Sequence, residues 1–437
     1  MNIVLLSGGS GKRLWPLSNE VRSKQFIKIF NGGKQSMVER VYCQIKSADP
    51  NARITIATSK SQVSAIHNQL GSGVAISIEP CRRDTFPAIA LAAAYLHDVE
   101  KISKDEVIVV CPVDPYVDDG YFETLKKLAL HAANAKANIT LMGIEPTYPS
   151  EKYGYIIPEN KADISKVTEF KEKPDKVTAE RYISRGALWN GGVFAFKLDY
   201  LLQKSSEILG VCDYWRLLNG YADFKKISFD YAVVEREKCI DVLRYNGEWK
   251  DLGTWNTLTE VMEQPVIGKG IMNENCKNVH IVNETGMPIV AMGLKDVVIS
   301  ASPDGILISD KEQSSYIKPY VDGIEQQIMF AEKSWGSYRV LDADKNSLTI
   351  KVTLKEGCAM NYHSHCLRDE VWVVISGKGR TTVDGMEQEV SVGDVITVQR
   401  GCKHKITAIT NLQLVEVQLG EEITVGDKIK HGESGEQ

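Results

Sequence analysis

A glycine-rich stretch at the start of the chain has the residue types that bind a polyphosphate. Gly8, Gly9 and Gly11 follow an apolar run, and Lys12 and Arg13 come directly after them. Glycines let backbone amides approach a phosphate closely, while the two cations balance its charge. The spacing fits neither a Walker A loop nor a Gly-x-Gly-x-x-Gly dinucleotide loop. We predict a phosphate-binding loop of another type, because a turn without a ligand explains the adjacent cations poorly.

Acidic residues further along have the surroundings expected of magnesium and sugar ligands. Asp114 follows the apolar run Val107–Cys111, and an aspartate at the carboxyl end of a buried strand is well placed to hold Mg²⁺. An N-capping aspartate is the alternative at this position. In Glu172-Lys173 the carboxylate can accept hydrogen bonds from two sugar hydroxyls, and the ammonium can contact a phosphate. A solvated surface charge run is the alternative for this pair.

A third group of residues has the spacing of a metal site. His363 and His365 are alternate residues, so on a strand they share one face, where Glu370 and His404 can join them. Three imidazoles and a carboxylate suit Zn²⁺, Fe²⁺, Mn²⁺ or a similar divalent ion. Polar barrel residues that bind no metal are the alternative.

Alternating apolar and amphipathic runs predict how these groups are positioned. A chain of 437 residues predicts two or three domains. Up to residue 262 the alternation indicates βα units on a largely parallel, Rossmann-like α/β sheet. In such sheets ligands bind at the carboxyl ends of the strands. The predicted strands are Ile3–Leu6, Ile54–Ala57, Val74–Ile78, Val107–Val110 and Ile139–Gly143, and the predicted helices are Ser36–Ser47, Ser61–Leu70 and Phe86–Glu100.

The second half of the chain has a different pattern. Short apolar runs separated by Asn, Gly and Asp between Gly268 and Val321 suggest a stack of short strands. Beyond residue 330, strand-like runs with turn signals about every ten residues indicate a small β-barrel. We therefore predict three domains, at residues 1–262, 263–328 and 329–437.

Composition excludes several classes of protein. A net charge of −5 and the lack of a Lys/Arg-rich run argue against a nonspecific nucleic-acid partner. No stretch reaches the ~18 apolar residues of a membrane span, so we expect no membrane partner. Nine cysteines without a Cys-x-x-Cys pair suggest reduced thiols, and we expect a cytoplasmic protein.

The first half of the chain resembles the sugar-1-phosphate nucleotidyltransferases. The run Gly9-x-Gly11-x-Arg13-Leu-Trp-Pro-Leu-Ser18, followed by Lys24-Gln25-Phe26, is similar to their signature. The Leu-Trp-Pro-Leu-Ser and Lys-Gln-Phe variants point within this group to mannose-1-phosphate guanylyltransferases. One departure is Ser23, where the family usually has proline. Further matches follow in order at Glu79–Ala88, Pro112–Pro115, Lys152–Ile156, Glu169–Pro174, Trp189–Phe194, Phe229–Glu235 and Trp249–Trp255.

The resemblance implies a reaction and assigns residues to it. An oxygen of mannose 1-phosphate would attack the α-phosphorus of GTP and release pyrophosphate, so that positioning and charge neutralisation provide the catalysis. It also implies a homo-oligomer and, at residues 263–328, a β-helix-like segment. The implied residues are Ser7, Gly8, Gly9, Gly11, Lys12, Arg83 and Asp84 for the nucleotide, Arg13, Lys24 and Lys173 for catalysis, Gly154, Glu172 and Asn190 for the sugar, and Asp114 and Asp251 for Mg²⁺.

The last domain resembles a cupin. The patterns Gly357-x5-His363-x-His365-x4-Glu370-x6-Gly377 and Gly393-x5-Gln399-x-Gly401-x2-His404 are similar to the two cupin motifs. In this context they resemble the isomerase half of bifunctional phosphomannose isomerase/guanylyltransferases. Asn361 replaces a glutamine of that family and the tail differs, so isomerase activity stays open. Two more hypotheses stay open: another nucleotide or sugar 1-phosphate as substrate, and a sugar-nucleotide sensor without turnover.

Overall fold

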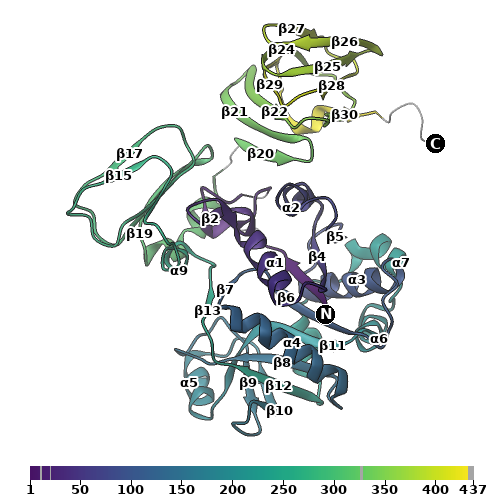
Figure 1. The fold of residues 1–437 in the computed structure, drawn as a ribbon, viewed down its shortest axis with the longest axis vertical. Helices are drawn as coiled ribbons and strands as arrows, with labels where there is room; N and C mark the ends of the chain where they lie inside the picture. The colour runs from purple at the N-terminus through teal and green to yellow at the C-terminus, as the bar shows by residue number, and fades with distance from the viewer. Residues whose placement is uncertain (10–11, 20, 325–327, 432–437) are drawn as a thin grey trace. The chain divides into compact units, whose positions relative to one another are not determined.

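A computed structural model describes residues 1–9, 12–19, 21–324 and 328–431 of the chain (Figure 1). The chain forms two compact units. The first, called here the N-terminal unit, comprises Met1–Arg13 and Ser23–Pro265. The second, called the C-terminal unit, comprises Leu14–Arg22 and Val266–Gln437.

The N-terminal unit is built on a nine-stranded sheet in the order β5-β4-β1-β6-β11-β8-β12-β10-β9. Strands β5, β4, β1 and β6 are parallel, but β11 runs antiparallel between β6 and β8, and β10 runs antiparallel to both its neighbours. Strand β12 is parallel to β8, and β9 is antiparallel to both β10 and β11, so only β10 and β11 run against the other strands. The prediction of a largely parallel sheet is therefore confirmed, with these two strands as the exceptions. The bounds are β1 (Asn2–Ser7), β4 (Arg53–Ser59), β5 (Ala75–Glu79), β6 (Val107–Pro112), β8 (Ile139–Ile144), β9 (Tyr155–Pro158), β10 (Ile164–Lys171), β11 (Leu188–Lys197) and β12 (Ile240–Tyr245).

Helices and short strands complete this unit. Helix α1 begins at a capping box, in which Ser36 Oγ accepts a hydrogen bond from Glu39 N and Glu39 Oε2 accepts one from Ser36 N. The helices are α1 (Met37–Ala48), α2 (Val63–Leu70), α3 (Thr85–Asp98), α4 (Asp119–Asn134), α5 (Lys176–Ser184), α6 (Leu198–Leu209), α7 (Tyr214–Gly220), α8 (Phe229–Ala232) and α9 (Trp255–Thr259). The remaining strands are β2 (Lys28–Phe30), β3 (Gln35–Ser36), β7 (Pro115–Val117) and β13 (Trp249–Asp251). All five predicted strands and all three predicted helices are present, with ends shifted by up to two residues.

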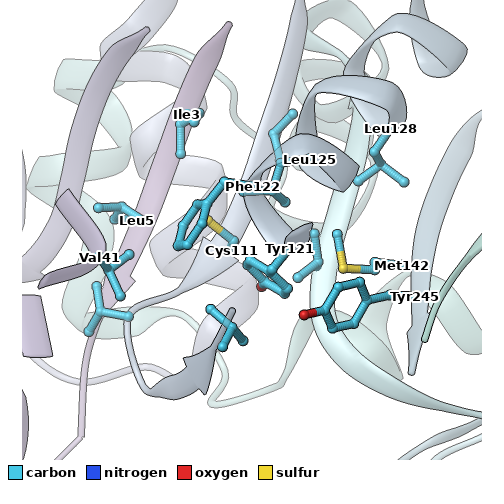
Figure 2. Close-up of a cluster of buried hydrophobic side chains, with 14 of the residues drawn as sticks. Ile3, Leu5, Val41, Cys111, Tyr121, Phe122, Leu125, Leu128, Met142 and Tyr245 are labelled. Carbon is cyan, nitrogen blue, oxygen red and sulfur yellow. The ribbon is translucent and has the colours of Figure 1, made fainter. Parts of the chain in front are cut away.

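Two hydrophobic clusters cover the two faces of the sheet. The side chains of β1 point alternately into one cluster and into the other, because successive side chains of a strand point to opposite faces. Ile3 and Leu5 pack with Phe122 and Leu125 of α4 in one cluster (Figure 2). Val4 belongs to the other cluster. The central strands are thus buried on both sides, and polar groups are left at the strand ends.

The first part of the C-terminal unit consists of short stacked strands. Strands β14, β16 and β18 pair in parallel, β15 pairs in parallel with β17, and β19 closes the sheet antiparallel to β18. Short strands of successive coils therefore pair in parallel, and these residues form the predicted β-helix-like segment. Its elements are β14 (Val266–Ile267), β15 (Gly270–Met272), β16 (His280–Asn283), β17 (Ile289–Ala291), β18 (Val297–Ser302), β19 (Gly305–Asp310) and α10 (Lys318–Val321).

The rest of the C-terminal unit is an antiparallel β-barrel, the predicted cupin. Its two sheets have the orders β20-β21-β22-β29-β24-β27 and β26-β25-β28-β23-β30. Trp372, Val374 and Leu414 fill the core between them. The strands are β20 (Phe330–Lys333), β21 (Gly336–Asp344), β22 (Ser347–Leu354), β23 (His363–His365), β24 (Arg368–Ser376), β25 (Lys378–Val383), β26 (Met386–Ser391), β27 (Val395–Val398), β28 (His404–Ala408), β29 (Leu412–Gly420) and β30 (Lys428–Lys430).

Two general features of the chain bear on its environment. None of the helices in the described residues combines the length and the apolar character needed to cross a membrane. All nine cysteines are free thiols, as their spacing predicts.

Candidate active site

The predicted phosphate loop leaves the carboxyl end of β1. Ser7 is its last strand residue, and Gly8 and Gly9 follow, the latter with φ +103°. A Cβ added at either glycine would meet no atom within 4 Å, so the loop backbone is open to an incoming group. Gly9 O accepts hydrogen bonds from Arg82 Nη2 at 3.3 Å and from Ser23 Oγ at 3.1 Å. Gly11 lies outside the described residues.

The cations after the loop lie in a short 3₁₀ turn, Lys12–Leu14. A Cβ placed on Gly253 would lie 3.7 Å from Arg13 Nη1 and 3.2 Å from Asp251 Oδ1. Arg13 therefore reaches the edge of the sheet where Asp251 lies. The catalytic role that the resemblance implies for Arg13 stays a prediction.

The predicted nucleotide residues Arg83 and Asp84 have partners within the protein. Asp84 caps α3, since its carboxylate accepts a hydrogen bond from Thr85 N at 2.7 Å. Arg83 Nη2 donates to the carbonyl of Ala222. The neighbouring Arg82, which we did not predict, is the arginine that contacts the loop. A nucleotide role for Arg83 and Asp84 stays a prediction.

Lys24 brings the two predicted magnesium ligands together. Its Nζ lies 3.0 Å from Asp114 Oδ2 and 3.9 Å from Asp251 Oδ1. Burial alone would lower the pKa of Lys24, but the carboxylates of Asp114 and Asp251 outweigh it and raise the pKa. Burial raises the pKa of Asp114, and Lys24 opposes this rise. Lys24 is therefore a fixed cation between two carboxylates.

A strand pair explains how these carboxylates meet. Asp114 follows β6 and directly precedes β7, while Asp251 ends β13. Strands β7 and β13 pair antiparallel, with Asp251 opposite Pro115. Asp114 Oδ1 is buried and has no hydrogen-bond partner among the described residues. An orphaned carboxylate oxygen beside a second carboxylate fits Mg²⁺, which prefers hard oxygen ligands.

The predicted sugar residues line a cavity of about 220 Å³ beside these carboxylates. Glu172 is only 7% exposed, and its Oε1 lies 2.7 Å from Lys173 Nζ. Asn190 Nδ2 donates to Asp230 Oδ1 at 2.6 Å, and Asn190 Oδ1 accepts from Gly192 N at 3.1 Å. Burial, followed by the charge of Glu172, raises the pKa of Asp230 to about 6. The cavity thus offers hydrogen-bonding groups and the ammonium of Lys152 to a polar ligand, and Lys173 contacts its Glu172.

Substituting Gly154 with alanine is expected to weaken this cavity. The new Cβ would lie 2.5 Å from Glu172 Oε2 and 3.3 Å from Asn190 Cβ, so the Glu172 carboxylate has to move. Because misplacing a positioning group by 1 Å can cost about 100-fold in rate, we expect kcat/KM for the sugar phosphate to fall by roughly 10- to 100-fold. Steady-state kinetics measures this fall, and an unchanged KM for the nucleotide is the control. An unchanged kcat/KM for the sugar phosphate would contradict the sugar-binding role of Glu172.

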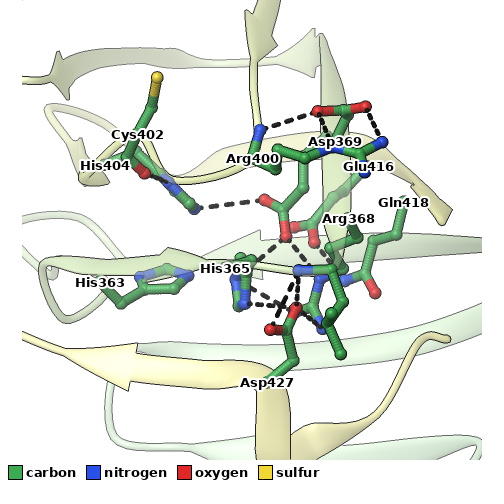
Figure 3. A network of polar contacts seen from close by, with 12 residues as sticks. His363, His365, Arg368, Asp369, Arg400, Cys402, His404, Glu416, Gln418 and Asp427 are labelled. Carbon is green, nitrogen blue, oxygen red and sulfur yellow. Dashed lines mark hydrogen bonds and ion pairs between the residues drawn. The ribbon is translucent and has the colours of Figure 1, made fainter.

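The histidine cluster lies inside the barrel (Figure 3). His363 and His365 on β23 and His404 on β28 have possible ligand atoms that all lie within 4.8 Å of one another. The Nδ1 atoms of His363 and His404 lie 2.6 Å and 2.9 Å from the carbonyls of Asn361 and Cys402. Donation to these carbonyls leaves Nε2 of both rings as the unprotonated ligand atom.

The protonation states in the cluster also suit a metal. Burial, followed by nearby positive charges, lowers the pKa of His363 to about 3. Burial, partly offset by Glu370, lowers the pKa of His365 to about 4. Both rings are therefore neutral near pH 7, which is the form that binds a divalent ion.

Glu370, the predicted fourth ligand, is held by other partners. Its two oxygens lie 3.2 Å and 3.3 Å from His365 Nε2 and His404 Nε2. Arg368 Nε and Trp372 Nε1 each donate to it at 3.1 Å. Glu370 thus contacts two of the three histidines and lies outside the compact set that they form.

A cavity of about 430 Å³ opens onto this cluster. Apolar side chains line it together with charged residues that the sequence did not point out: Lys333, Arg368, Glu416 and Lys428. Asp427 of the C-terminal tail accepts hydrogen bonds from Cys366 N and Leu367 N, so the tail is part of the site. Arg368 was predictable, because it shares a strand face with Glu370. Asp427 had no such signal.

Two family models match the chain. The family described as nucleotidyl transferase matches residues 2–265. The family described as mannose-6-phosphate isomerase C-terminal matches residues 324–433. The first match covers more than half of the chain.

Known proteins are similar to the chain over nearly its whole length. It is 30% identical to mannose-1-phosphate guanylyltransferase RfbM of Salmonella typhimurium, over 98% of this chain and 96% of that one. It is 29% identical to the xanthan biosynthesis protein XanB of Xanthomonas campestris, over 98% and 97% of the two chains. The crystal structure of "mannose-1-phosphate geranyltransferase" from Thermus thermophilus is 30% identical, with a TM-score of 0.63 over 74% of this chain and 98% of that one.

Proposed function

Because the chain belongs to the nucleotidyl transferase family, we propose that it is an enzyme that transfers GMP from GTP to mannose 1-phosphate, giving GDP-mannose and pyrophosphate. One observation carries this proposal: Lys24 lies between Asp114 and Asp251 beside a cavity lined by Glu172 and Asn190. Relatives named mannose-1-phosphate guanylyltransferase support the choice of substrates.

The chain's own residues supply positioning and charge. The glycines after β1, with Lys12 and Arg13, bind the triphosphate, and Lys24 stabilises the charge that develops on the phosphates during transfer. Glu172 and Asn190 hold the sugar hydroxyls, and Lys173 holds the phosphate whose oxygen attacks. No protein nucleophile is needed, because the attacking oxygen belongs to the substrate.

We assign Mg²⁺ to Asp114 and Asp251, whose oxygens fit this ion. When bound, Mg²⁺ neutralises phosphate charge and orients the phosphate oxygens. Among the protein's own groups, the positive charge of Lys24, 3.0 Å from Asp114, balances the negative charge of the same carboxylates. Lys24 and the ion held by Asp114 and Asp251 would together offset the negative charge of the reacting phosphate.

The test is pyrophosphate release with each of four nucleoside triphosphates against a panel of sugar 1-phosphates in Mg²⁺ buffer. We expect GTP with mannose 1-phosphate to give the highest kcat/KM. A different best pair would keep the reaction type and change the substrates. No release with any pair would favour the sugar-nucleotide sensor.

Glu79 supports guanine as the base. It ends β5, three residues before Arg82, which contacts the loop at Gly9. Tyr221 Oη donates to Glu79 Oε2 at 3.1 Å, and burial raises the pKa of Glu79 against this hydrogen bond. A carboxylate is complementary to the N1–H and 2-amino donors of guanine, whereas adenine presents an acceptor at N1.

Replacing Glu79 with glutamine is therefore expected to reduce base discrimination. An amide cannot accept two hydrogen bonds from guanine at both positions, so kcat/KM for GTP is expected to fall by roughly 10- to 100-fold. The fall for ITP, which lacks the 2-amino group, is expected to be smaller. Kinetics with GTP and ITP measures both values. An unchanged GTP to ITP ratio would contradict the role of Glu79.

A second function, mannose-6-phosphate isomerisation, is favoured by the histidine cluster in the barrel cavity. A divalent metal such as Zn²⁺ fits His363, His365 and His404, and when bound it would polarise the substrate oxygens. The family match of residues 324–433 supports the same proposal. The test is formation of mannose 6-phosphate from fructose 6-phosphate with added Zn²⁺ or Mn²⁺.

We also propose that the chain is a cytoplasmic homo-oligomer. Strand β19 pairs only with β18 among the described strands, and its Ile306 and Ile308 are 58% and 69% exposed. Such an apolar edge can pair with a second copy. Substituting Ile308 with lysine is expected to shift sedimentation toward the monomer, and a monomeric parent protein would contradict the proposal.

The nine free thiols support the cytoplasm as the location.

A further inference from the structure

A cluster of buried polar side chains lies beneath the phosphate loop. We call it the loop-support cluster, and each member is at most 1% exposed. Its members come from β1, from the short turn Lys24–Phe26, and from β4 with the turn Lys60–Gln62 that follows it. Apart from Ser7, which the resemblance assigns to the nucleotide, none of them has a role in the proposed chemistry. The members are Ser7, Ser23, Gln25, Thr58 and Gln62.

Gln62 is at the centre of the cluster. Its Nε2 donates to Ser23 Oγ at 2.5 Å, while its Oε1 lies 2.7 Å from Thr58 Oγ1 and accepts from Gln25 Nε2 at 3.3 Å. Rotating the amide by 180° would place its NH₂ group against the amide of Gln25, so donor would face donor. The network therefore determines the orientation of Gln62.

The cluster connects the loop to both neighbours of Lys24. Ser23 Oγ, which accepts from Gln62, donates to Gly9 O at 3.1 Å. On the other side of Lys24, Gln25 Nε2 donates to Ser7 Oγ at 3.1 Å. The hydroxyl of Ser23 does not cap its own turn.

The turn itself leaves little freedom to the backbone of Lys24. Phe26 N donates to Ser23 O and Ile27 N donates to Lys24 O, both at 3.1 Å. The side chain of Lys24 then extends to Asp114, 3.0 Å away. Phe26 and Ile27 are almost fully buried, at 2% and 1% exposure. The backbone from which Lys24 projects is thus fixed on both sides.

Gln25 shows that this arrangement has a cost. Its Oε1 is buried without a hydrogen-bond partner among the described residues. A buried, unpaired amide oxygen destabilises the folded protein, so Gln25 makes its hydrogen bonds to Ser7 and Gln62 at a cost in stability.

We propose that Gln62 is a positioning residue that acts through Ser23 to fix Lys24 and the phosphate loop relative to each other. This inference rests on the proposed function only in giving Lys24 a role at the reacting phosphates. In the resembling family a proline usually takes the place of Ser23. Proline has no hydroxyl and could make neither hydrogen bond, so this chain holds its lysine by contacts of its own.

The test begins with Gln62→Leu, which keeps the approximate volume and removes all three hydrogen bonds. Because small displacements of a positioned group can cost up to about 100-fold in rate, we expect kcat to fall by roughly 10- to 100-fold. KM for the nucleotide is expected to change by less than about 3-fold, since the loop glycines remain. Gln203→Leu on α6, which removes one hydrogen bond to Asp199, is the matched control.

A double-mutant cycle with Lys24→Met distinguishes positioning from general stability. If Gln62 acts through Lys24, adding Gln62→Leu to Lys24→Met leaves kcat unchanged within about 2-fold. A purely structural role would lower kcat by the same factor in both backgrounds. That result, or a Gln62→Leu enzyme with normal kcat and a lowered melting temperature, would overturn the proposal.

Two further measurements cover the remaining outcomes. If Gln62→Leu does not fold, Ser23→Ala removes the same connection with a smaller change and is expected to show the same kinetic pattern. A crystal structure of the folded variant needs no substrate, and the Lys24 Nζ to Asp114 distance is expected to increase from 3.0 Å. An unchanged distance contradicts the inference. Activity of the parent enzyme with a pair other than GTP and mannose 1-phosphate contradicts only the proposed function.

Discussion

Replacing Lys24 with methionine is expected to lower kcat for pyrophosphate release by about 1,000-fold, which is about 4 kcal/mol of transition-state stabilisation. The reason is its position. Lys24 Nζ lies 3.0 Å from Asp114 in a half-buried site, where an ammonium interacts with phosphate more strongly than it does in water. Methionine keeps most of the side-chain volume and removes the charge. Single-turnover kinetics with saturating substrates measures the effect on the chemical step.

Stability and turnover should respond differently to this change. Methionine leaves two neighbouring carboxylates without their cation, but both are partly exposed, at 33% for Asp114 and 40% for Asp251. Water and Mg²⁺ can therefore offset the negative charge of these two carboxylates, and we expect the protein to fold normally. Lys204→Met is the matched control, because Lys204 pairs with Glu207 on α6 at 2.8 Å. A Lys24→Met enzyme within 10-fold of the parent kcat would contradict the assignment of this site.

Local patterns predicted the elements of the N-terminal unit well. Apolar runs placed β1 and β6, and the amphipathic run Ser36–Ser47 placed α1. The loop after β1 and Asp114 after β6 were expected at one edge, because parallel strands carry their carboxyl ends there. Their proximity follows from the direct pairing of β1 with β6.

Long-range pairing was not predictable from local patterns. Asp251 reaches Asp114 because β13 pairs with β7, and these two strands of three residues have no strong periodicity. Only the family resemblance suggested this carboxylate. The antiparallel strand β11 was missed for the same reason, since strand direction depends on chain connections rather than on composition.

Buried polar groups are the other class that sequence analysis missed. Ser23 and Gln62 stand in polar stretches that are typical of the protein surface, yet they are 0% and 1% exposed. Their burial depends on several hydrogen bonds to distant segments, which no local signal reports. In the barrel, by contrast, the two-residue spacing of His363 and His365 predicted their common face correctly.

Replacing His363 with alanine is expected to abolish metal binding in the barrel. The parent protein should bind about one divalent ion per chain at the three histidines, and loss of one ligand should weaken affinity by at least about 100-fold, since losing even an outer hydrogen-bond partner costs 10- to 100-fold. Isomerase activity, which depends on that ion, should disappear. Metal content after dialysis, measured by mass spectrometry, checks the first result independently of activity.

The matched control for this prediction is His431→Ala. His431 Nε2 lies 2.8 Å from Ser364 Oγ and outside the cluster, so its loss should leave the metal content unchanged. Pyrophosphate release should stay within about 2-fold of the parent in both variants, because the reacting groups of the transferase lie in another unit of the chain. Equal metal content in the parent and in His363→Ala would contradict the metal site. If the parent protein binds metal but does not isomerise fructose 6-phosphate, the proposed metal site stands and the proposed second activity is wrong. Both can hold together, because three imidazoles bind a metal without the base that proton transfer in the isomerisation requires.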